Sequence, residues 1–340
     1  MINSELPINQ SSNRWFQRLA LLTVIVVYLL ILVGGIVRSM GAGMGCPDWP
    51  KCFGSWVPPT EESQLPPNYK EIWGEKLKGE VEFNALKTWT EYLNRLFGAF
   101  TGFLIFGTLL AAVPFLRKDR SIFYMSLLAF VLVGFQGWLG SKVVSFELLP
   151  LLVTLHMLVA IVIVFVLLYV LARSSVQRLT IEKMTNKGLV NKWLGWIIGL
   201  SLLQVLMGTQ VRELIDEAIK TLGYGVRDRW IGTLDYRFYV HRSFSLVILA
   251  LHLGLIYQLR KNAKTIGIIS KLTVALIGLV LAEIATGIIL TYLGMPAFAQ
   301  PLHLTLATVI LGIQFVTLLL LNSDKVFRTQ SVKNVQLIES

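Results

Sequence analysis

The chain has 340 residues, of which 54% are apolar and 15% charged, and its mean hydropathy is +0.65. A soluble domain carries about 25% charged residues, so this composition excludes that class and predicts an integral membrane protein. The net charge of +11 does not indicate nucleic-acid binding, because the charge lies in loops that flank the apolar segments.

Eight apolar stretches are each long enough, at about 20 residues, to cross a bilayer as a helix. The sequence contains no strand-forming domain, so we expect an all-α membrane protein. The first stretch is too long for a signal-peptide core of about 7–15 residues. The short, polar N-terminus is unlike a mitochondrial transit peptide, which favours a bacterial cytoplasmic (inner) membrane. The predicted spans are 16–37, 91–116, 121–140, 151–172, 192–211, 239–259, 271–292 and 301–321.

The distribution of basic residues predicts the orientation of these spans. The two termini and the loops after the second, fourth and sixth spans, with the residues next to them, hold 17 of the 31 Lys and Arg residues but only five of the 20 acidic residues. We therefore expect both termini to be cytoplasmic and the two long loops, 39–90 and 212–238, to face outward.

The chain also contains an internal repeat with an offset of 147 residues. Equal spacing across two halves indicates a duplication in which two similar helical bundles each build a site. We therefore expect two pseudo-symmetric four-helix bundles side by side. The offset carries Tyr92, Asn94, Arg95, Gly140 and His156 to Tyr239, His241, Arg242, Gly287 and His303.

This repeat predicts five segments besides the outer loop. They are a cytoplasmic N-terminus (1–15), an N-terminal bundle (16–172), a polar cytoplasmic linker (173–192), a C-terminal bundle (193–322) and a cytoplasmic tail (323–340).

The repeated positions 94, 156, 241 and 303 lie near the start of predicted membrane helices, and their residue types suit a haem site. In the second half both are histidines, His241 and His303, on facing helices, as two axial ligands of one haem iron would be. In the first half His156 remains as an iron ligand, while Asn94 replaces the other histidine. The second half thus offers two candidate ligands for a haem iron, and the first half offers one and leaves the other coordination position open. The fourth histidine, His252, has no histidine at its repeat position, and we interpret it as structural.

Four arginines are expected at the level of these ligands. Their planar, permanently charged forks could neutralise haem propionates. The alternative is that they anchor helix ends at the membrane interface. Their duplication beside the candidate ligands favours propionate binding by Arg38, Arg95, Arg212 and Arg242.

Two acidic residues fall within the predicted spans. Glu91 shares a helix face with Asn94, and its repeat equivalent is the apolar Phe238. The acid is therefore special to the open half, and we predict a catalytic or proton-handling role for it. A helix-end acid or a simple partner of Arg95 is the alternative. Glu283 is costly within a membrane and is a candidate to support the ligands.

The two cysteines of the chain, Cys46 and Cys52, lie in the first outer loop. A pair outside the cytoplasmic membrane can persist as a disulfide. Closing so short a loop gains little chain entropy, so a structural staple and a redox-cycling pair near a redox site remain equal alternatives. Zinc binding is disfavoured, because no histidine lies nearby to complete four ligands.

These features together resemble the haem A synthase family over nearly the whole chain. The family has a Glu-x-x-His-Arg motif in the second span and further haem ligands where this chain has His156, His241 and His303. The cysteine loop carries the other part of the resemblance, in residues 35–38, the run Gly-Cys-Pro-Asp-Trp-Pro at 45–50, Cys52, Gly54 and Pro58-Pro59.

The resemblance implies an oxidoreductase that converts a methyl group of haem O to a formyl group, with water as the oxygen source, to make haem A for terminal oxidases. It implies a haem b held by His241 and His303 in the C-terminal bundle, and haem O as substrate in the N-terminal bundle. It also implies disulfide formation by Cys46 and Cys52. Haem O synthase and oxidase assembly factors would be partners in the membrane lipid, with a homo-oligomer possible and no nucleic acid; the electron acceptor is not identified.

One position departs from the family pattern. Asn94 stands where the family has its usual histidine, and a neutral amide is a poor iron ligand. Bis-histidine ligation of the substrate haem therefore cannot be carried over. We expect Asn94 to hydrogen-bond an oxygen species on the open face. A di-haem electron-transfer or quinol-oxidising cytochrome and an inactive homologue are the alternatives.

Overall fold

The computed structural model describes residues 10–74, 82–263 and 266–327. Most of the predicted N-terminus and C-terminal tail therefore lies outside the described residues. Eight helices in this part of the chain are long and apolar enough to cross a membrane. They are α1 (Gln10–Ser39), α3 (Ala85–Ala112), α4 (Arg120–Ser145), α5 (Pro150–Ser175), α6 (Lys187–Leu222), α8 (Tyr236–Asn262), α9 (Ile268–Tyr292) and α10 (Ala299–Leu321). The all-α, multi-pass membrane fold is confirmed.

All eight membrane helices extend beyond the predicted spans at one end or both, and the structure gives the reason for two of these extensions. α3 begins at Ala85, where the side chain of Asn84 accepts a hydrogen bond from the Lys87 amide and caps the first turn. α6 continues to Leu222, because Leu214 and its neighbours pack against the fully buried Trp230. The second predicted outer loop is therefore helical over its first part.

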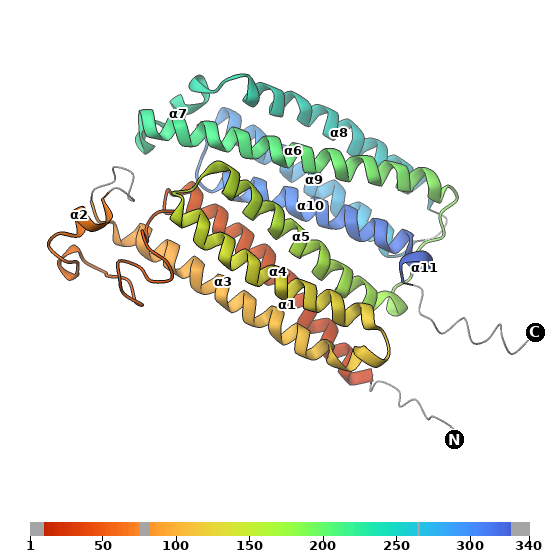
Figure 1. Cartoon of the computed structure of the whole chain (residues 1–340). Helices are drawn as coiled ribbons and strands as arrows, with labels where there is room; N and C mark the ends of the chain where they lie inside the picture. Colours follow the sequence, from red (N-terminus) through yellow and green to blue (C-terminus); the bar gives the residue numbers. More distant parts are fainter. Residues whose placement is uncertain (1–9, 75–81, 264–265, 328–340) are drawn as a thin grey trace, which may run out of the picture.

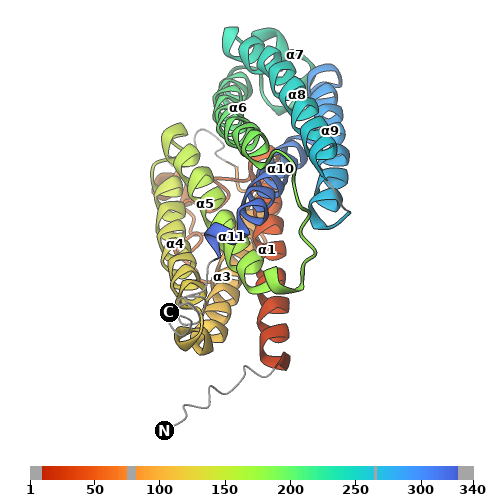
Figure 2. The ribbon, with the colours of Figure 1, turned by 90° about the vertical axis from the view of Figure 1, so that its right-hand side faces the viewer.

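The long helices pack in two closed groups of four. In the first group α1 and α4 each contact both α3 and α5; in the second, α6 and α9 each contact both α8 and α10. α10 also packs against α1 and α5. It therefore lies on the side of its own group that faces the first group, as both views show (Figure 1, Figure 2). The pseudo-symmetric two-bundle architecture stays a prediction, which these contacts support.

Burial within the helices follows this arrangement. In the most apolar 18-residue segment of each helix, 50% of the residues of α10 are buried, compared with 11% of those of α8. Large apolar side chains such as Phe103 and Leu246 project outward from α3 and α8, with exposed fractions of 74% and 68%. Surface of this kind is stable in lipid, where the helices satisfy their own backbone hydrogen bonds.

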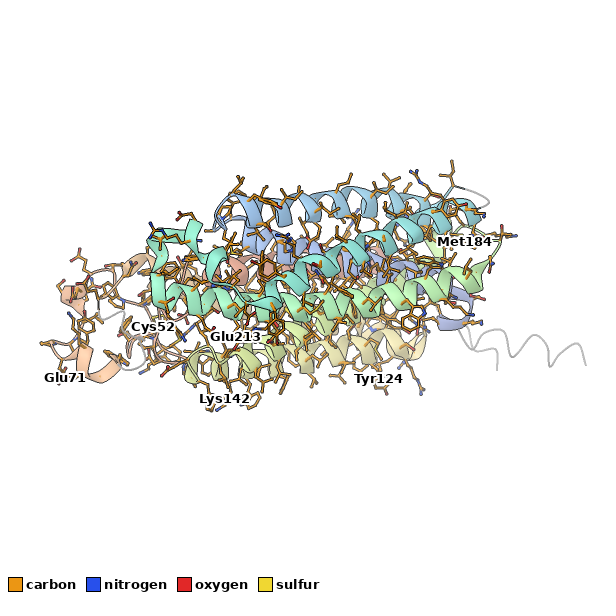
Figure 3. All side chains as sticks on the ribbon, turned by 90° about the horizontal axis from the view of Figure 1, so that it is seen from above. Cys52, Glu71, Tyr124, Lys142, Met184 and Glu213 are labelled. Atoms are coloured by element: carbon orange, nitrogen blue, oxygen red, sulfur yellow. A yellow bond between two sulfur atoms is a disulfide. The ribbon has the colours of Figure 1, made fainter. Side chains whose placement is uncertain are left out.

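The first outer loop and the linker occupy opposite ends of the molecule. Figure 3 shows Cys52 and Glu71 at one end, and Met184 of the linker at the other. We call these the disulfide end and the linker end. The loop contains α2 (Tyr69–Trp73), α7 (Arg227–Trp230) precedes α8 at the disulfide end, and α11 (Ser323–Val326) follows α10 at the linker end.

Candidate functional site

Cys46 and Cys52 form a disulfide, and both are fully buried. The turn between them is held by Asp48, whose carboxylate accepts hydrogen bonds from the Phe53 and Gly54 amides at 2.6 and 2.8 Å. Aspartate commonly closes turns in this way. The predicted cysteine pairing is confirmed.

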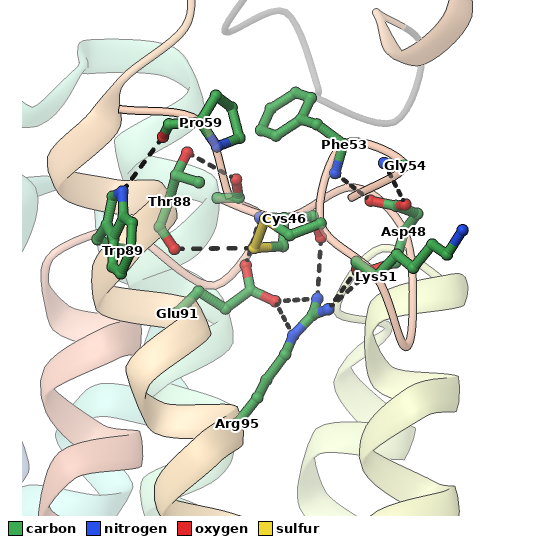
Figure 4. Close-up of a disulfide and its surroundings, with 12 residues drawn as sticks. Cys46, Asp48, Lys51, Phe53, Gly54, Pro59, Thr88, Trp89, Glu91 and Arg95 are labelled. Carbon is green, nitrogen blue, oxygen red and sulfur yellow. Dashed lines mark hydrogen bonds and ion pairs between the residues drawn. A yellow bond between two sulfur atoms is a disulfide. The ribbon is translucent and has the colours of Figure 1, made fainter. Parts of the chain in front are cut away.

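The disulfide loop rests directly on Glu91 and Arg95 of α3 (Figure 4). The Cys46 amide donates to Glu91 Oε2 at 2.8 Å, and Arg95 Nε donates to Glu91 Oε1 at 3.1 Å. The Arg95 guanidinium also donates to three backbone carbonyls of the loop, those of Cys46 (3.0 Å), Asp48 (2.7 Å) and Lys51 (3.1 Å). Arg95 thus holds the loop against the helix.

This contact changes the interpretation of Glu91. Glu91 is 3% exposed and lies in the second turn of α3 rather than in its first. Both carboxylate oxygens have partners, one in the loop and one in Arg95. Its repeat equivalent, Phe238, packs in an apolar cluster with Trp230. Glu91 therefore connects the disulfide loop to the helix face that carries Asn94.

Each of the three repeat-related histidines lies against a glycine of a neighbouring helix. A Cβ added at Gly140, Gly208 or Gly287 would lie 3.3, 3.4 or 3.5 Å from the Cε1 atom of His156, His241 or His303, respectively. The glycines thus leave room for the imidazole rings. Gly208 follows Gly34 by the same 174 residues that separate Val37-Arg38 from Val211-Arg212, and this spacing could have identified it.

His303 is oriented through its Nδ1 atom. This atom lies 2.9 Å from Thr286 Oγ1 and 3.2 Å from Glu283 Oε1. A proton on Nδ1 that is donated to these oxygens leaves the Nε2 lone pair free. Metal-ligating histidines are commonly held in this way by a carboxylate. The geometry therefore fits the prediction that Glu283 supports His303.

Among the described residues, three of these repeated positions hold buried polar atoms that have no hydrogen-bond partner. They are Asn94 Oδ1, His156 Nδ1 and His241 Nδ1. An unsatisfied buried polar atom costs about 1–3 kcal/mol, so their gathering at the repeat positions is typical of a ligand site. Two glutamines missed in the sequence support the same helices: Gln136 and Gln204 donate to the backbone carbonyls of His156 and His241 at 2.8 and 3.1 Å.

The four predicted arginines do not form one cluster. Arg38 of α1 and Arg212 of α6 meet at Asp216, whose oxygens lie 2.7 and 2.8 Å from them. Arg95 is engaged by the disulfide loop, and the guanidinium of the exposed Arg242 lies over the Tyr239 ring at 6.0 Å. Arg38 and Arg212 are thus the pair placed between the two helix groups.

One further arginine was not singled out from the sequence. Arg227 of α7 donates to the carbonyls of Ser39 and Met295 at 3.3 and 3.2 Å, and its guanidinium lies 4.8 Å from the Trp230 ring centroid. It therefore ties the ends of α1 and α9 together near Arg38 and Arg212. Its position outside the repeat left no signal for it.

Comparisons with known proteins show the family of the chain. The family model described as cytochrome oxidase assembly protein matches residues 17–315. A heme A synthase of Shewanella oneidensis is 25% identical over 301 residues, covering 81% of this chain and 86% of its own length. The heme A synthase of Brucella suis is 27% identical over 322 residues, with coverage of 84% and 86%. Because the matched region spans most of the sequence, the chain belongs to the cytochrome oxidase assembly protein family.

Proposed function

We propose that this protein is a haem A synthase, which oxidises a methyl group of haem O to the formyl group of haem A. The observation that carries the proposal is the asymmetry of the two helix groups. One holds a histidine on each of two facing helices, and the other holds one histidine opposite Asn94, beneath Glu91 and the disulfide loop. The relatives named heme A synthase support the same activity.

His241 and His303 would hold a haem b through their imidazole nitrogens. The fit rests on the glycine beside each ring and on the Glu283 contact with His303 Nδ1. When bound, this haem supplies one-electron transfer, for which a saturated iron is suited. Arg38 and Arg212 offer their guanidinium groups to propionates at the disulfide end. Gln204 keeps the backbone of His241 in place.

The substrate haem O would lie between α3 and α5, with His156 on its iron. Conversion of the methyl group requires one water and releases four protons and four electrons. Glu91 lies one turn from Asn94 and is positioned to accept protons from that face. Asn94 provides an amide that can hydrogen-bond water, and it leaves one side of the substrate iron open.

The same proposal gives the protein its surroundings. The disulfide loop would face the outside of a bacterial cytoplasmic membrane, with both termini inside, as the basic residues indicate. Haem O synthase would supply the substrate, and terminal oxidase assembly would use the product. The N-terminal group (16–172) would then be the substrate half and the C-terminal group (193–322) the cofactor half.

The test is a haem analysis of the purified full-length chain from a bacterium that makes haem O. Solvent extraction and chromatography should recover haem b together with haem O or haem A. Recovery of haem b alone, from cells that contain haem O, would contradict the proposal and favour a simple cytochrome.

A further inference from the structure

A hydrogen-bonded pair lies below the candidate haem ligands of the cofactor half. His252 and Gln314 follow His241 and His303 by 11 residues each. Eleven residues are three helical turns with about 20° of rotation, and about 16 Å along the axis. The pair therefore continues the two ligand faces of α8 and α10 toward the linker end.

Both ring nitrogens of His252 have a hydrogen-bond partner. His252 Nδ1 lies 2.8 Å from the Ile248 carbonyl and donates to it, so Nε2 is left as an acceptor. Gln314 Nε2 lies 2.8 Å from His252 Nε2 and donates to it. The two residues are 3% and 0% exposed. This contact joins α8 to α10 across the second helix group.

We call the two positions 11 residues after the candidate ligands of a half its layer. In the substrate half this layer is apolar. Asn94 and His156 are followed after 11 residues by Ile105 and Leu167. Both side chains are 1% exposed and belong to one apolar cluster between the helices of the first group. The repeat therefore places a polar contact in one half where the other half has two aliphatic side chains.

The two haems differ in the part that would meet this layer. If the propionates are bound at the disulfide end, near Arg38 and Arg212, the opposite edge of each ring would point toward the linker end. That edge carries vinyl groups in haem b, whereas in haem O one vinyl is replaced by a long farnesyl-bearing chain. Aliphatic side chains can move aside for an isoprenoid, whereas separation of His252 from Gln314 leaves buried polar groups without partners.

Building on the proposed function, we propose that the His252–Gln314 contact determines which haem each half accepts. The contact disfavours a farnesylated haem in the cofactor half, and the Ile105–Leu167 layer accepts one in the substrate half. Discrimination by a penalty on the wrong ligand is a common source of specificity.

The test exchanges the layer of one half for that of the other. His252→Ile and Gln314→Leu are combined in the full chain in a His156→Ala background, in which only the cofactor half keeps candidate iron ligands. The protein is purified from cells that make haem b and haem O, and its haems are extracted and separated. The ratio of bound haem O to haem b should rise about tenfold, which is about 1.4 kcal/mol.

An unchanged ratio, or loss of haem b with no uptake of haem O, would overturn this inference. The matched control is Thr23→Val with Thr108→Val, which removes a buried hydroxyl pair 2.9 Å apart in the other helix group and should leave the ratio unchanged. The reverse exchange, Ile105→His with Leu167→Gln in an otherwise unaltered chain, should lower farnesylated haem and retain haem b. A reverse variant that keeps its farnesylated haem would also contradict the inference.

The unaltered chain, extracted in parallel, separates the two proposals. If it holds no farnesylated haem, the proposed function fails and this inference fails with it. If it holds haem O or haem A and the exchanges have no effect, the inference alone fails.

Discussion

Glu91, together with Arg95, joins the disulfide loop to α3. Its carboxylate receives the Cys46 amide on one oxygen and the Arg95 guanidinium on the other. A carboxylate held by a fixed donor on each oxygen keeps its orientation when a substrate binds. In the proposed reaction this carboxylate, one helical turn before Asn94, would accept protons released from that face of α3.

Replacement of Glu91 by Ala should therefore stop the reaction without emptying the cofactor half. Haem A formation should fall by about 100-fold or more, as expected for the loss of a general base. Haem b should remain bound, because His241 and His303 are unaltered. The measurement is chromatography of haems extracted from membranes, with the exposed Glu71→Gln as control. Normal haem A from the Glu91 variant would assign this acid to loop anchoring alone.

Glu283 should affect the cofactor half in a different way. In Glu283→Gln the carboxylate that faces His303 Nδ1 at 3.2 Å is lost, so the imidazole becomes a weaker donor to iron. Haem b affinity should fall by about 10-fold or more, and the reduction potential of the remaining haem should rise. Spectroelectrochemistry checks the potential. Thr291→Val, on the same helix, is the control, and an unshifted potential would separate Glu283 from the ligand.

At this scale the sequence indicated the histidines and Glu91 as candidates, because the repeat compares each position with its equivalent. The loop contacts were not predictable. Nothing in the spacing shows that the loop folds back over α3 and engages Arg95. Asp216 was missed for a similar reason, since its two partners come from helices of different halves.

Among the elements, the linker between the halves has a structural role beyond connection. The buried Glu182 accepts hydrogen bonds from the amides of Gly267, Ile269 and Ser270, at 2.7, 2.9 and 2.7 Å. These amides form the start of α9, where a helix has free N–H groups and a partial positive charge. Glu182 therefore fastens the linker to the first turn of α9.

This cap should make the stability of the chain depend on pH. Burial raises the pKa of Glu182, but the backbone N–H donors outweigh it and hold the pKa below its ordinary value. The stabilisation is therefore present above the unfolded pKa of about 4.3 and is lost as the pH falls through the lower folded pKa. Glu182→Gln should be less stable by about 1 kcal/mol at neutral pH.

Thermal unfolding of the detergent-solubilised chain at pH 7 and pH 4 checks this expectation. The difference between wild type and Glu182→Gln should narrow at the lower pH, while the exposed Glu61→Gln should match wild type at both. Equal stability of the Glu182 variant and wild type at pH 7 would contradict the capping role.

The spans themselves were predictable, because hydropathy alone marks about 20 apolar residues. The ends were not. α6 runs on to Leu222 through a polar stretch, and this extension depends on tertiary packing against Trp230. Hydropathy identifies the apolar residues that cross the membrane, but it does not identify such tertiary contacts. The part of a helix that continues beyond the membrane is therefore wrongly assigned to a loop.

On the scale of the whole molecule, the two ends differ in what they carry. The disulfide loop lies at one end, where the Cys46 amide meets Glu91, and the linker lies at the other. The excess of basic residues near the linker end predicts that this end is cytoplasmic. The disulfide would then lie in an oxidising compartment.

Thiol labelling tests this orientation. The native cysteines are fully buried in a disulfide, so single new cysteines at exposed positions can report the side of the membrane. A membrane-impermeant maleimide should label Glu71→Cys in cells with an intact cytoplasmic membrane, after any outer membrane has been made permeable to the reagent. Lys183→Cys in the linker should be labelled only after lysis. The opposite pattern would reverse the topology.

The central claim is that this chain oxidises haem O, and haem A formation tests it most directly. The full-length protein is expressed in a bacterium that makes haem O and has no haem A of its own, and the membrane haems are extracted and separated by chromatography. Haem A should appear with the wild-type chain and be absent with Glu91→Ala. Haem O without any haem A in cells that contain the folded, haem b-loaded wild-type protein would contradict the account.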